Sequence, residues 1–396
     1  MALLPVGEAF ARYREHVKPL GTQRVPVELA LGAVLAESPR ARIALPRFTQ
    51  SALDGYAIRS QDGGRPRMLV GLSAAGEPAN VAVRQGQAVR IYTGGMLPEG
   101  ADAIARQEIV DRDGDEISLR DTVRAGEGVR YEGEELLEGA EIAQAGQRVT
   151  AGLLAALAMA GIAEVDVRRR PRVAVLVTGD EVVKVGETLA DAKVYDANGP
   201  LLRAWFVEHG YGEPVIAYVP DDEAALEESM SAALDSADFV VTSGGVSVGD
   251  RDYVPAVADR LGVRQVFWKV AQKPGKPLWF GVREGKVLLG MPGNPAAVLV
   301  CLAVHARAVL GHLEGETAIQ PAWRQGVLEG SVEADSERDR LVRMRLDMAD
   351  AVARLSLLPL QDSHMLSNLA SAHALVWLPS RETAFQAGDK VAWITL

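Results

Sequence analysis

Three short segments combine glycine with hydroxyl, amide or carboxylate side chains, and each follows a run of apolar residues. They are residues 178–181 (Thr-Gly-Asp-Glu), 243–249 (Ser-Gly-Gly-Val-Ser-Val-Gly) and 291–295 (Met-Pro-Gly-Asn-Pro). Glycine lets backbone N–H groups approach an anion closely, and a helix that follows adds its positive end. Segment 243–249 therefore predicts a phosphate-binding loop, with an ordinary turn as the alternative.

Carboxylates gather near the same segments and near other predicted strand ends. They are Asp180, Glu181, Asp196, Asp221 and Asp252. Mg²⁺ prefers hard oxygen ligands and needs one or two carboxylates together with phosphate oxygens of a substrate. Aspartate after a strand is also a favoured N-cap or turn residue, so both roles are open for each aspartate. As a group, these residues favour a site where Mg²⁺ meets phosphate.

A basic segment, residues 268–277, contrasts with these acidic surroundings. It places Lys273 and Lys276 among prolines and a glycine, and proline lowers the entropy cost of holding a loop in one shape. A lysine ammonium is a point charge that suits an oxyanion. We therefore predict an anion pocket here, with a solvated basic loop as the alternative. Arginines also crowd one later segment, where both a second anion contact and a solvated strand face are open: Arg338, Arg340, Arg343 and Arg345.

The elements that position these residues can be predicted from apolar runs. Residues 172–178, 239–242 and 287–290 are nearly continuous apolar stretches, typical of strands buried on both faces of a parallel sheet. Residues with helical spacing lie between and after them, at 226–234 and from 295 to about 310. Strand and helix thus alternate, which predicts a doubly wound α/β domain. In such a sheet, ligands bind at the carboxyl ends of the strands, where the three glycine-containing segments fall.

The rest of the chain has different patterns of apolar residues. Residues 1–40 have helical spacing and predict two helices with a turn, and helical spacing returns at 151–160. The short alternating runs between them predict an inserted β domain, and the C-terminal residues predict a second β domain. The resulting domains are 1–40 with 137–168, then 41–136, 169–314 and 315–396.

Composition narrows the function further. The formal net charge of −11 argues against unspecific binding to nucleic acid or to an anionic membrane, because both are polyanions. The N-terminus has no signal-peptide pattern, and no uncharged apolar stretch reaches about 18 residues, so we expect a cytoplasmic protein. The single cysteine, Cys301, excludes an internal disulfide and predicts a buried thiol.

Taken together, several motifs resemble the MoeA/gephyrin family of molybdopterin molybdenumtransferases in their order and spacing. Besides the three segments above and residues 273–277, they are residues 51–57 (Ser-Ala-Leu-Asp-Gly-Tyr-Ala), 92–94 (Tyr-Thr-Gly) and 98–102 (Pro-Glu-Gly-Ala-Asp). The resemblance implies an elongated helical domain, an inserted β domain, an α/β domain similar to MogA-like molybdopterin adenylyltransferases, and a C-terminal β barrel. It also implies a homodimer whose active site lies between the α/β domain of one subunit and the inserted β domain of the other.

By that resemblance the substrates are adenylylated molybdopterin and molybdate, with Mg²⁺, and the products are molybdenum cofactor and AMP. An adenylyltransferase similar to MogA and downstream cofactor-handling proteins are the implied partners. The residues implied as catalytic are Asp54, Asp180, Glu181, Asp221 and Asp252, with all but Asp54 as metal ligands. Those implied to bind the pterin substrate are Thr93, Thr178, Asp196, Ser243, Gly244, Gly245, Ser247, Gly249, Pro292, Gly293, Asn294 and Pro295. Those similar to molybdate contacts are Lys273, Lys276, Ser363 and an arginine, Arg340 or Arg345.

The chain departs from the family pattern at three positions. Glu135 stands where aspartate is usual, Ala297 where serine is usual, and Arg343 where an aromatic residue is common. Ala297 removes a hydroxyl that resembles a molybdate contact, so the choice between molybdate and tungstate stays open. Two other functions are alternatives: an ATP-dependent adenylyltransferase or nicotinamide-nucleotide amidase that shares the α/β domain, and a non-catalytic scaffold.

Overall fold

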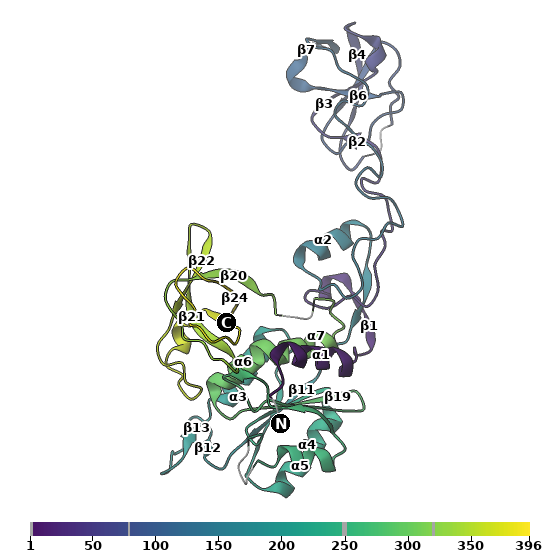
Figure 1. Ribbon diagram of the computed structural model, residues 1–396. Helices are drawn as coiled ribbons and strands as arrows, with labels where there is room; N and C mark the ends of the chain where they lie inside the picture. The colour runs from purple at the N-terminus through teal and green to yellow at the C-terminus, as the bar shows by residue number, and fades with distance from the viewer. Residues whose placement is uncertain (1–2, 78–79, 248–251, 319–320) are drawn as a thin grey trace.

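The computed structural model describes residues 3–77, 80–247, 252–318 and 321–396. Figure 1 shows an elongated chain in which the inserted β domain lies far from the α/β and C-terminal parts. Two extended stretches of chain run side by side to reach it, and isolated bridges join them at Arg40 with Glu141 and at Leu45 with Leu136. The exact limits of the four domains stay a prediction.

The α/β part is built on one six-stranded sheet with the order β14-β11-β15-β19-β18-β16. Its strands are β14 (Val215–Val219), β11 (Val173–Thr178), β15 (Phe239–Ser243), β19 (Lys286–Met291), β18 (Trp279–Arg283) and β16 (Arg264–Trp268). The first four are parallel; β11, β15 and β19 were predicted, and β14 adds a strand that was not predicted. The last two are antiparallel, because the turn between β18 and β19 is too short for the crossover that a parallel pair needs.

Helices cover both faces of this sheet (Figure 1). One face packs against α1 (Val6–His16), α3 (Asn198–Glu208) and a long helix made of α6 (Pro295–Cys301), the π-helical turn Leu302–Ala306 and α7 (Arg307–Leu313). The other face packs against α4 (Glu223–Ser236) and α5 (Val254–Arg260). The predicted doubly wound arrangement is therefore confirmed. The stretch Pro295–Leu313 is also long and apolar enough to cross a membrane, but 83% of it is buried, as expected of a helix in the protein core.

Of the two helices predicted within residues 1–40, the first is present as α1 and the second is not formed. After α1, the chain forms strand β1 (Thr22–Pro26) and a single 3₁₀ turn (Val27–Leu29). β1 pairs antiparallel with β10 (Glu164–Arg168), and Val34 and Leu35 form isolated bridges with Arg148 and Val167. Long-range pairing therefore overrides the helical spacing of residues 27–35. The apolar side chains of this region share a small core with α2 (Ala151–Met159).

The inserted β domain is a six-stranded sheet, as its alternating pattern predicted. In the order β6-β3-β5-β4-β8-β7, the strands are Ala103–Arg106, Gly55–Ile58, Gln87–Ile91, Arg67–Ser73, Glu116–Leu119 and Val110–Asp113. Two small apolar clusters stabilise it, one on each face.

The C-terminal part is a closed five-stranded barrel. Its strands are β20 (Arg324–Leu328), β21 (Asp339–Ala349), β22 (Val352–Leu357), β23 (Ala374–Leu378) and β24 (Lys390–Thr395). The ladder runs β21-β22-β20-β24-β23 and closes because β23 also pairs with β21. A short strand from the α/β part, β17 (Gln272–Lys273), adds to β21 in parallel. The predicted lysine loop is therefore tied to the barrel by backbone pairing.

Candidate active site

A pocket of about 550 Å³ lies at the carboxyl ends of β11, β15 and β19. Its lining includes eleven of the residues that the sequence singled out: Thr178, Glu181, Asp196, Asp221, Ser243, Gly244, Gly245, Asp252, Gly293, Asn294 and Pro295. The parallel strands bring these distant segments together because their carboxyl ends share one edge of the sheet. We call this the acidic pocket.

The glycine-rich loop is packed directly onto the end of β11. Gly244 and Gly245 have φ of +98° and +71°, values that glycine adopts without strain. A Cβ on Gly244 would lie 2.6 Å from Thr178 Oγ1, and one on Gly245 would lie 2.8 Å from Val254 Cγ2. Both positions therefore need glycine, and the loop leads toward the N-terminus of α5. In the same loop, Ser247 is exposed, and Gly249 lies outside the described residues.

Asp196 lines the acidic pocket, but its carboxylate already accepts several hydrogen bonds. Its donors are the backbone N–H groups of Asn198 (2.8 Å) and Gly199 (3.0 Å) and the hydroxyl of Tyr218 (2.9 Å). Burial and this hydroxyl contact raise the pKa of Tyr218 to about 12, so Tyr218 stays a donor. Asp196 therefore anchors the start of α3, whatever contact it makes with a ligand.

Asn198 is a pocket residue that sequence reasoning passed over. Its Nδ2 donates to Ser243 Oγ (2.7 Å) and to the backbone O of Gly293 (2.7 Å). It thereby joins the loops that follow β15 and β19. Its position two residues after Asp196 at the start of a helix was the signal available in the sequence.

The remaining carboxylates divide into two groups. Glu181, Asp221 and Asp252 line the acidic pocket, whereas Asp180 accepts a hydrogen bond from the backbone N–H of Asp221 (3.1 Å) and is not among the lining residues. Among the described residues, no three acidic, histidine or cysteine side chains form a ready-made metal site. Mg²⁺ needs only one or two carboxylates beside phosphate oxygens, so this set of hard oxygen donors at a phosphate-type loop fits the ion.

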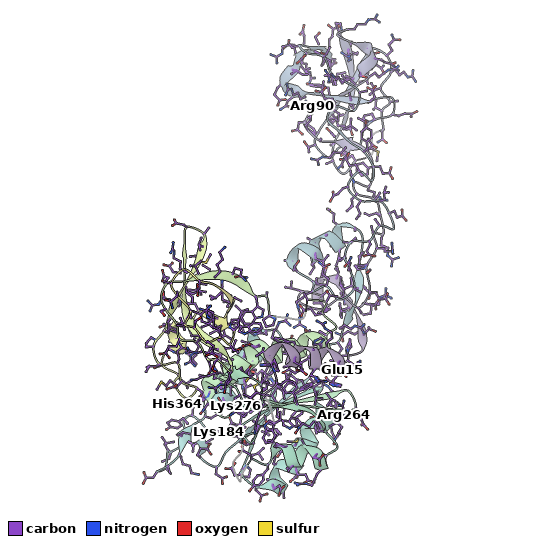
Figure 2. The ribbon with its side chains drawn as sticks, in the orientation of Figure 1. Glu15, Arg90, Lys184, Arg264, Lys276 and His364 are labelled. Carbon is purple, nitrogen blue, oxygen red and sulfur yellow. The ribbon has the colours of Figure 1, made fainter. Side chains whose placement is uncertain are left out.

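A second pocket, of about 340 Å³, lies where the barrel meets the α/β sheet. Its lining brings together Lys273, Lys276, Pro292 and Ser363. Its lining also includes Gln272, Gln361 and Asp362, which were not assigned to an anion site, and Arg338, for which an anion contact was left open. Figure 2 shows Lys276 and His364, another lining residue, close to each other at this junction. We call this the basic pocket.

The two arginines expected in the basic pocket lie elsewhere. Arg340 donates to the backbone O of Glu333, and Arg345 is exposed on β21. Arg338 lines the pocket instead, and it also pairs with Asp335 at 2.9 Å. The difference arises because β21 begins at Asp339, so that Arg338 lies in the preceding loop beside the pocket.

Asn294 belongs to both pockets. Its Nδ2 donates to Ser363 Oγ at 2.8 Å, and the backbone N–H of Ala296 donates to Ser363 O at 3.2 Å. The acidic and basic pockets are therefore neighbours that share one amide side chain. Ala297, which also lines the basic pocket, is buried.

Asp54 and Thr93 lie in the inserted β domain, far from both pockets within one chain (Figure 1). The backbone N–H and the hydroxyl of Thr93 both donate to Asp54 Oδ1 at 2.8 Å. These two hydrogen bonds lower the pKa of Asp54, so its carboxylate is fixed in place and ionised. Arg90, labelled in Figure 2, lies on the same sheet.

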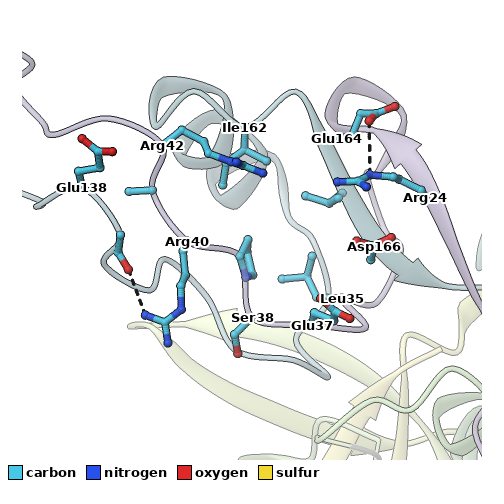
Figure 3. A pocket seen from close by; sticks show the side chains of 14 residues that line it. Arg24, Leu35, Glu37, Ser38, Arg40, Arg42, Glu138, Ile162, Glu164 and Asp166 are labelled. Carbon is cyan, nitrogen blue, oxygen red and sulfur yellow. Dashed lines mark hydrogen bonds and ion pairs between the residues drawn. The ribbon is translucent and has the colours of Figure 1, made fainter.

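A third cavity, of about 570 Å³, lies between β1, β10 and residues 37–42 (Figure 3). Among its charged lining residues, Arg24 lies 3.3 Å from Glu164, and Arg40 donates to the backbone O of Gly139. It has neither a glycine-rich loop nor a strand end of the parallel sheet. We therefore place the chemistry in the acidic and basic pockets.

Comparison with known proteins agrees with this geometry. Residues 4–161 match the MoeA N-terminal region (domain I and II), residues 174–312 a probable molybdopterin binding domain, and residues 325–396 the MoeA C-terminal region (domain IV). The molybdopterin molybdenumtransferase of Staphylococcus aureus (strain MRSA252) is 31% identical over 395 residues, covering 98% of this chain and 94% of the relative. That of Staphylococcus epidermidis (strain ATCC 12228) is 30% identical with the same coverage.

Solved structures give the same result for the fold. The molybdopterin biosynthesis MoeA protein of Pyrococcus horikoshii OT3 superposes with a TM-score of 0.85 and 26% identity over 100% of both chains. A second solved structure of a molybdopterin biosynthesis MoeA protein from Pyrococcus horikoshii gives a TM-score of 0.82 and 28% identity over 99% of both chains. The chain therefore belongs to the MoeA family of molybdopterin molybdenumtransferases.

Proposed function

We propose that this protein is an enzyme of molybdenum cofactor biosynthesis, which inserts molybdate into adenylylated molybdopterin and releases AMP. The observation that carries the proposal is the pairing of two pockets of opposite character around Asn294. One offers a glycine-rich loop and carboxylates, and the other offers lysines and an arginine. A substrate with a pyrophosphate at one end and a metal-binding dithiolene at the other needs both.

The backbone N–H of Gly245 would bind the pyrophosphate, close to the start of α5. The backbone N–H of Gly244 instead donates to the backbone O of Met291 at 3.0 Å and fixes the loop to the end of β19. Glu181, Asp221 and Asp252 would hold Mg²⁺, which when bound withdraws charge from the pyrophosphate. Lys273, Lys276 and Arg338 would bind molybdate as a dianion, with Ser363 as a further donor. Holding the two reactants side by side supplies much of the rate enhancement, because it removes the entropy cost of their encounter.

We assign Asp54 and Thr93 to the active site of a partner subunit in a homodimer. Support comes from the fixed, ionised carboxylate of Asp54 on a domain that cannot reach its own pockets in the described conformation. A subunit-mixing experiment tests this assignment. Asp54→Ala mixed with Asp252→Ala is expected to regain activity, because one of the two sites in the mixed dimer is then intact.

The proposal also includes the setting of the enzyme. An adenylyltransferase would supply its substrate, and the enzyme would work in the cytoplasm. The four domains would span 1–40 with 137–168, 41–136, 169–314 and 315–396.

Incubation of the purified protein with adenylylated molybdopterin, molybdate and Mg²⁺ tests the function. We expect AMP and active molybdenum cofactor in equal amounts. Metal-free molybdopterin with ATP serves as the control, because product from that mixture alone would identify an adenylyltransferase instead.

A further inference from the structure

A chain of three buried hydrogen bonds connects α1 with the lysine loop of the basic pocket, residues 273–276. The three side chains that form it are Tyr13 on α1, His305 in the π-helical turn and Gln272 on β17, and none has any exposed surface. Tyr13 Oη lies 2.9 Å from His305 Nδ1, and His305 Nε2 lies 2.7 Å from Gln272 Oε1. Gln272 Nε2 then donates to the backbone O of Gly275 at 3.3 Å. Burying polar groups in an apolar core is costly unless they are paired, so this arrangement calls for an explanation.

The donors and acceptors of this chain allow one direction only. The backbone O of Gly275 can only accept, so the Gln272 amide must turn Nε2 toward it and Oε1 toward His305. His305 Nε2 must then carry the ring proton, which leaves Nδ1 to accept from the Tyr13 hydroxyl. Burial lowers the pKa of His305 to about 3 and raises the pKa of Tyr13, so at neutral pH the ring is neutral and the hydroxyl keeps its proton. All three hydrogen bonds therefore point from α1 toward the lysine loop.

The chain ends at a residue that lies between the two lysines of the basic pocket. Gly275 has a φ of +98°, and a Cβ at this position would lie 2.4 Å from Gln272 Nε2. The loop backbone therefore packs directly on the Gln272 amide. The backbone O of Gly275 also accepts from the N–H of Leu278 at 3.3 Å, which closes the loop. Because Lys273 and Lys276 both line the basic pocket, the position of this backbone sets where their side chains start.

The N-terminal segment contacts the same stretch of chain at a second point. The backbone N–H of Leu4 donates to the backbone O of Lys269 (3.1 Å), and its backbone O accepts from the N–H of Ala271 (2.7 Å). His305 comes from the long core helix, at the π-helical turn Leu302–Ala306. Turns of this kind interrupt the regular helix and are frequent at functional sites. The chain of hydrogen bonds thus joins α1 and the core helix to one wall of the basic pocket.

We propose that Gln272, His305 and Tyr13 are positioning residues of the basic pocket, which hold its two lysines at the separation that a tetrahedral oxyanion requires. The inference rests on the proposed function for the identity of the ion, molybdate. Lysine side chains are flexible, so a fixed backbone lowers the entropy cost of ordering them around the ion. Tyr13 and His305 are not among the residues that line the pocket. Their effect on anion binding must therefore pass through Gln272 and the lysine loop.

Calorimetric titration of the full-length protein with molybdate alone tests the proposal. His305→Phe keeps a flat ring but removes two hydrogen bonds, and we expect it to weaken molybdate binding about twentyfold, because the lysines lose their alignment. His305→Gln keeps a donor for Gln272 and an acceptor for Tyr13, so its affinity should stay within about twofold of the wild type. The KM for adenylylated molybdopterin should not change in either variant, because the acidic pocket is built from other loops.

Tyr13→Phe decides the matter if His305→Phe does not fold, since it removes a single hydroxyl. We expect it to weaken molybdate binding about fivefold, as for the loss of one hydrogen bond. Tyr211→Phe is the matched control, because the Tyr211 hydroxyl donates to Glu314 at 2.9 Å and this residue lines neither pocket. The affinity of the control variant should equal that of the wild type.

Three results would overturn this inference alone. They are equal weakening in His305→Gln and His305→Phe, unchanged molybdate binding in His305→Phe or Tyr13→Phe, and the same weakening in Tyr211→Phe as in Tyr13→Phe. Absence of molybdate binding in the wild type would instead overturn the proposed function.

Discussion

The acidic and basic pockets lie side by side but are built in different ways. The acidic pocket is formed at the ends of parallel strands within one sheet, and its loops are fixed by local contacts such as those of Asn198 with Ser243 and Gly293. The basic pocket is formed across two domains, by the pairing of β17 with β21 and by the contact of Ser363 with α6. A substitution in the barrel should therefore weaken molybdate binding in the basic pocket before it weakens pyrophosphate binding in the acidic pocket.

The largest effects should come from the carboxylates of the acidic pocket. Asp252→Ala and Glu181→Ala are each expected to lower AMP release at least about a hundredfold, since they remove ligands to Mg²⁺ and leave the pyrophosphate charge uncompensated. Molybdate affinity, measured by calorimetry, should stay within about twofold because its pocket is intact. Asp259→Ala is the control, because Asp259 is an exposed aspartate on α5. An equal loss of AMP release in this variant would show that the carboxylates of the acidic pocket have no special role.

The basic pocket should give the reverse pattern. Lys276→Ala is expected to raise the KM for molybdate about tenfold to a hundredfold, as for the loss of a charged hydrogen bond of about 1.5–3 kcal/mol. The KM for the adenylylated substrate should not change. Lys269→Ala is a matched control, because Lys269 belongs to the same segment but lies over the Trp268 ring at 4.4 Å. A uniform rise in both KM values would show that the two pockets are not separable.

A pH effect should arise behind the basic pocket. His305 is fully buried, with Nδ1 2.9 Å from the Tyr13 hydroxyl and Nε2 2.7 Å from Gln272 Oε1. Burial lowers the pKa of His305 to about 3, below its value of about 6.5 in the unfolded chain. The unfolded state therefore binds more protons between these values, and the stabilisation present above about pH 6.5 is lost as the pH falls.

Between pH 7 and pH 5, proton uptake at His305 in the unfolded state should lower the free energy of unfolding by about 2 kcal/mol. Urea denaturation of the wild type at the two pH values measures this loss, and His305→Gln should show a smaller one. The same pH dependence in both proteins would assign it to other groups.

The smallest effect should come from the residue that both pockets share. Asn294→Ala removes the hydrogen bond to Ser363 Oγ, which is worth about 1 kcal/mol. We expect the KM for molybdate and that for the adenylylated substrate each to rise about fivefold. A change in only one of them would assign Asn294 to that pocket alone.

The same contrast explains what could be predicted from the sequence. Ser243, Gly244, Gly245 and Asn294 were found because parallel strands place their carboxyl ends at one edge, so a motif after each strand is enough to locate the acidic pocket. In the basic pocket the lysines were found, but Arg340 and Arg345 were expected where Arg338 lies. A shift of a few residues in where β21 begins decides which side chain reaches the pocket, and that depends on pairing with β17, which no local pattern encodes.

Long-range strand pairing also explains the other features that the sequence did not predict. Residues 27–35 have helical spacing but form a 3₁₀ turn and isolated bridges after β1, and β18 and β16 join the sheet antiparallel beside β19. The burial of Arg343 likewise depends on closure of the barrel. Asp54 is a different case, because one chain alone does not bring it to either pocket.

In the proposed function the two pockets work as one site, so cleavage of the pyrophosphate depends on molybdate bound in the basic pocket. The most direct test is AMP release from adenylylated molybdopterin by the wild-type protein with Mg²⁺, followed with and without molybdate. We predict that AMP release rises with molybdate concentration and is at least about tenfold slower without it. AMP release at the same rate without molybdate would contradict the account.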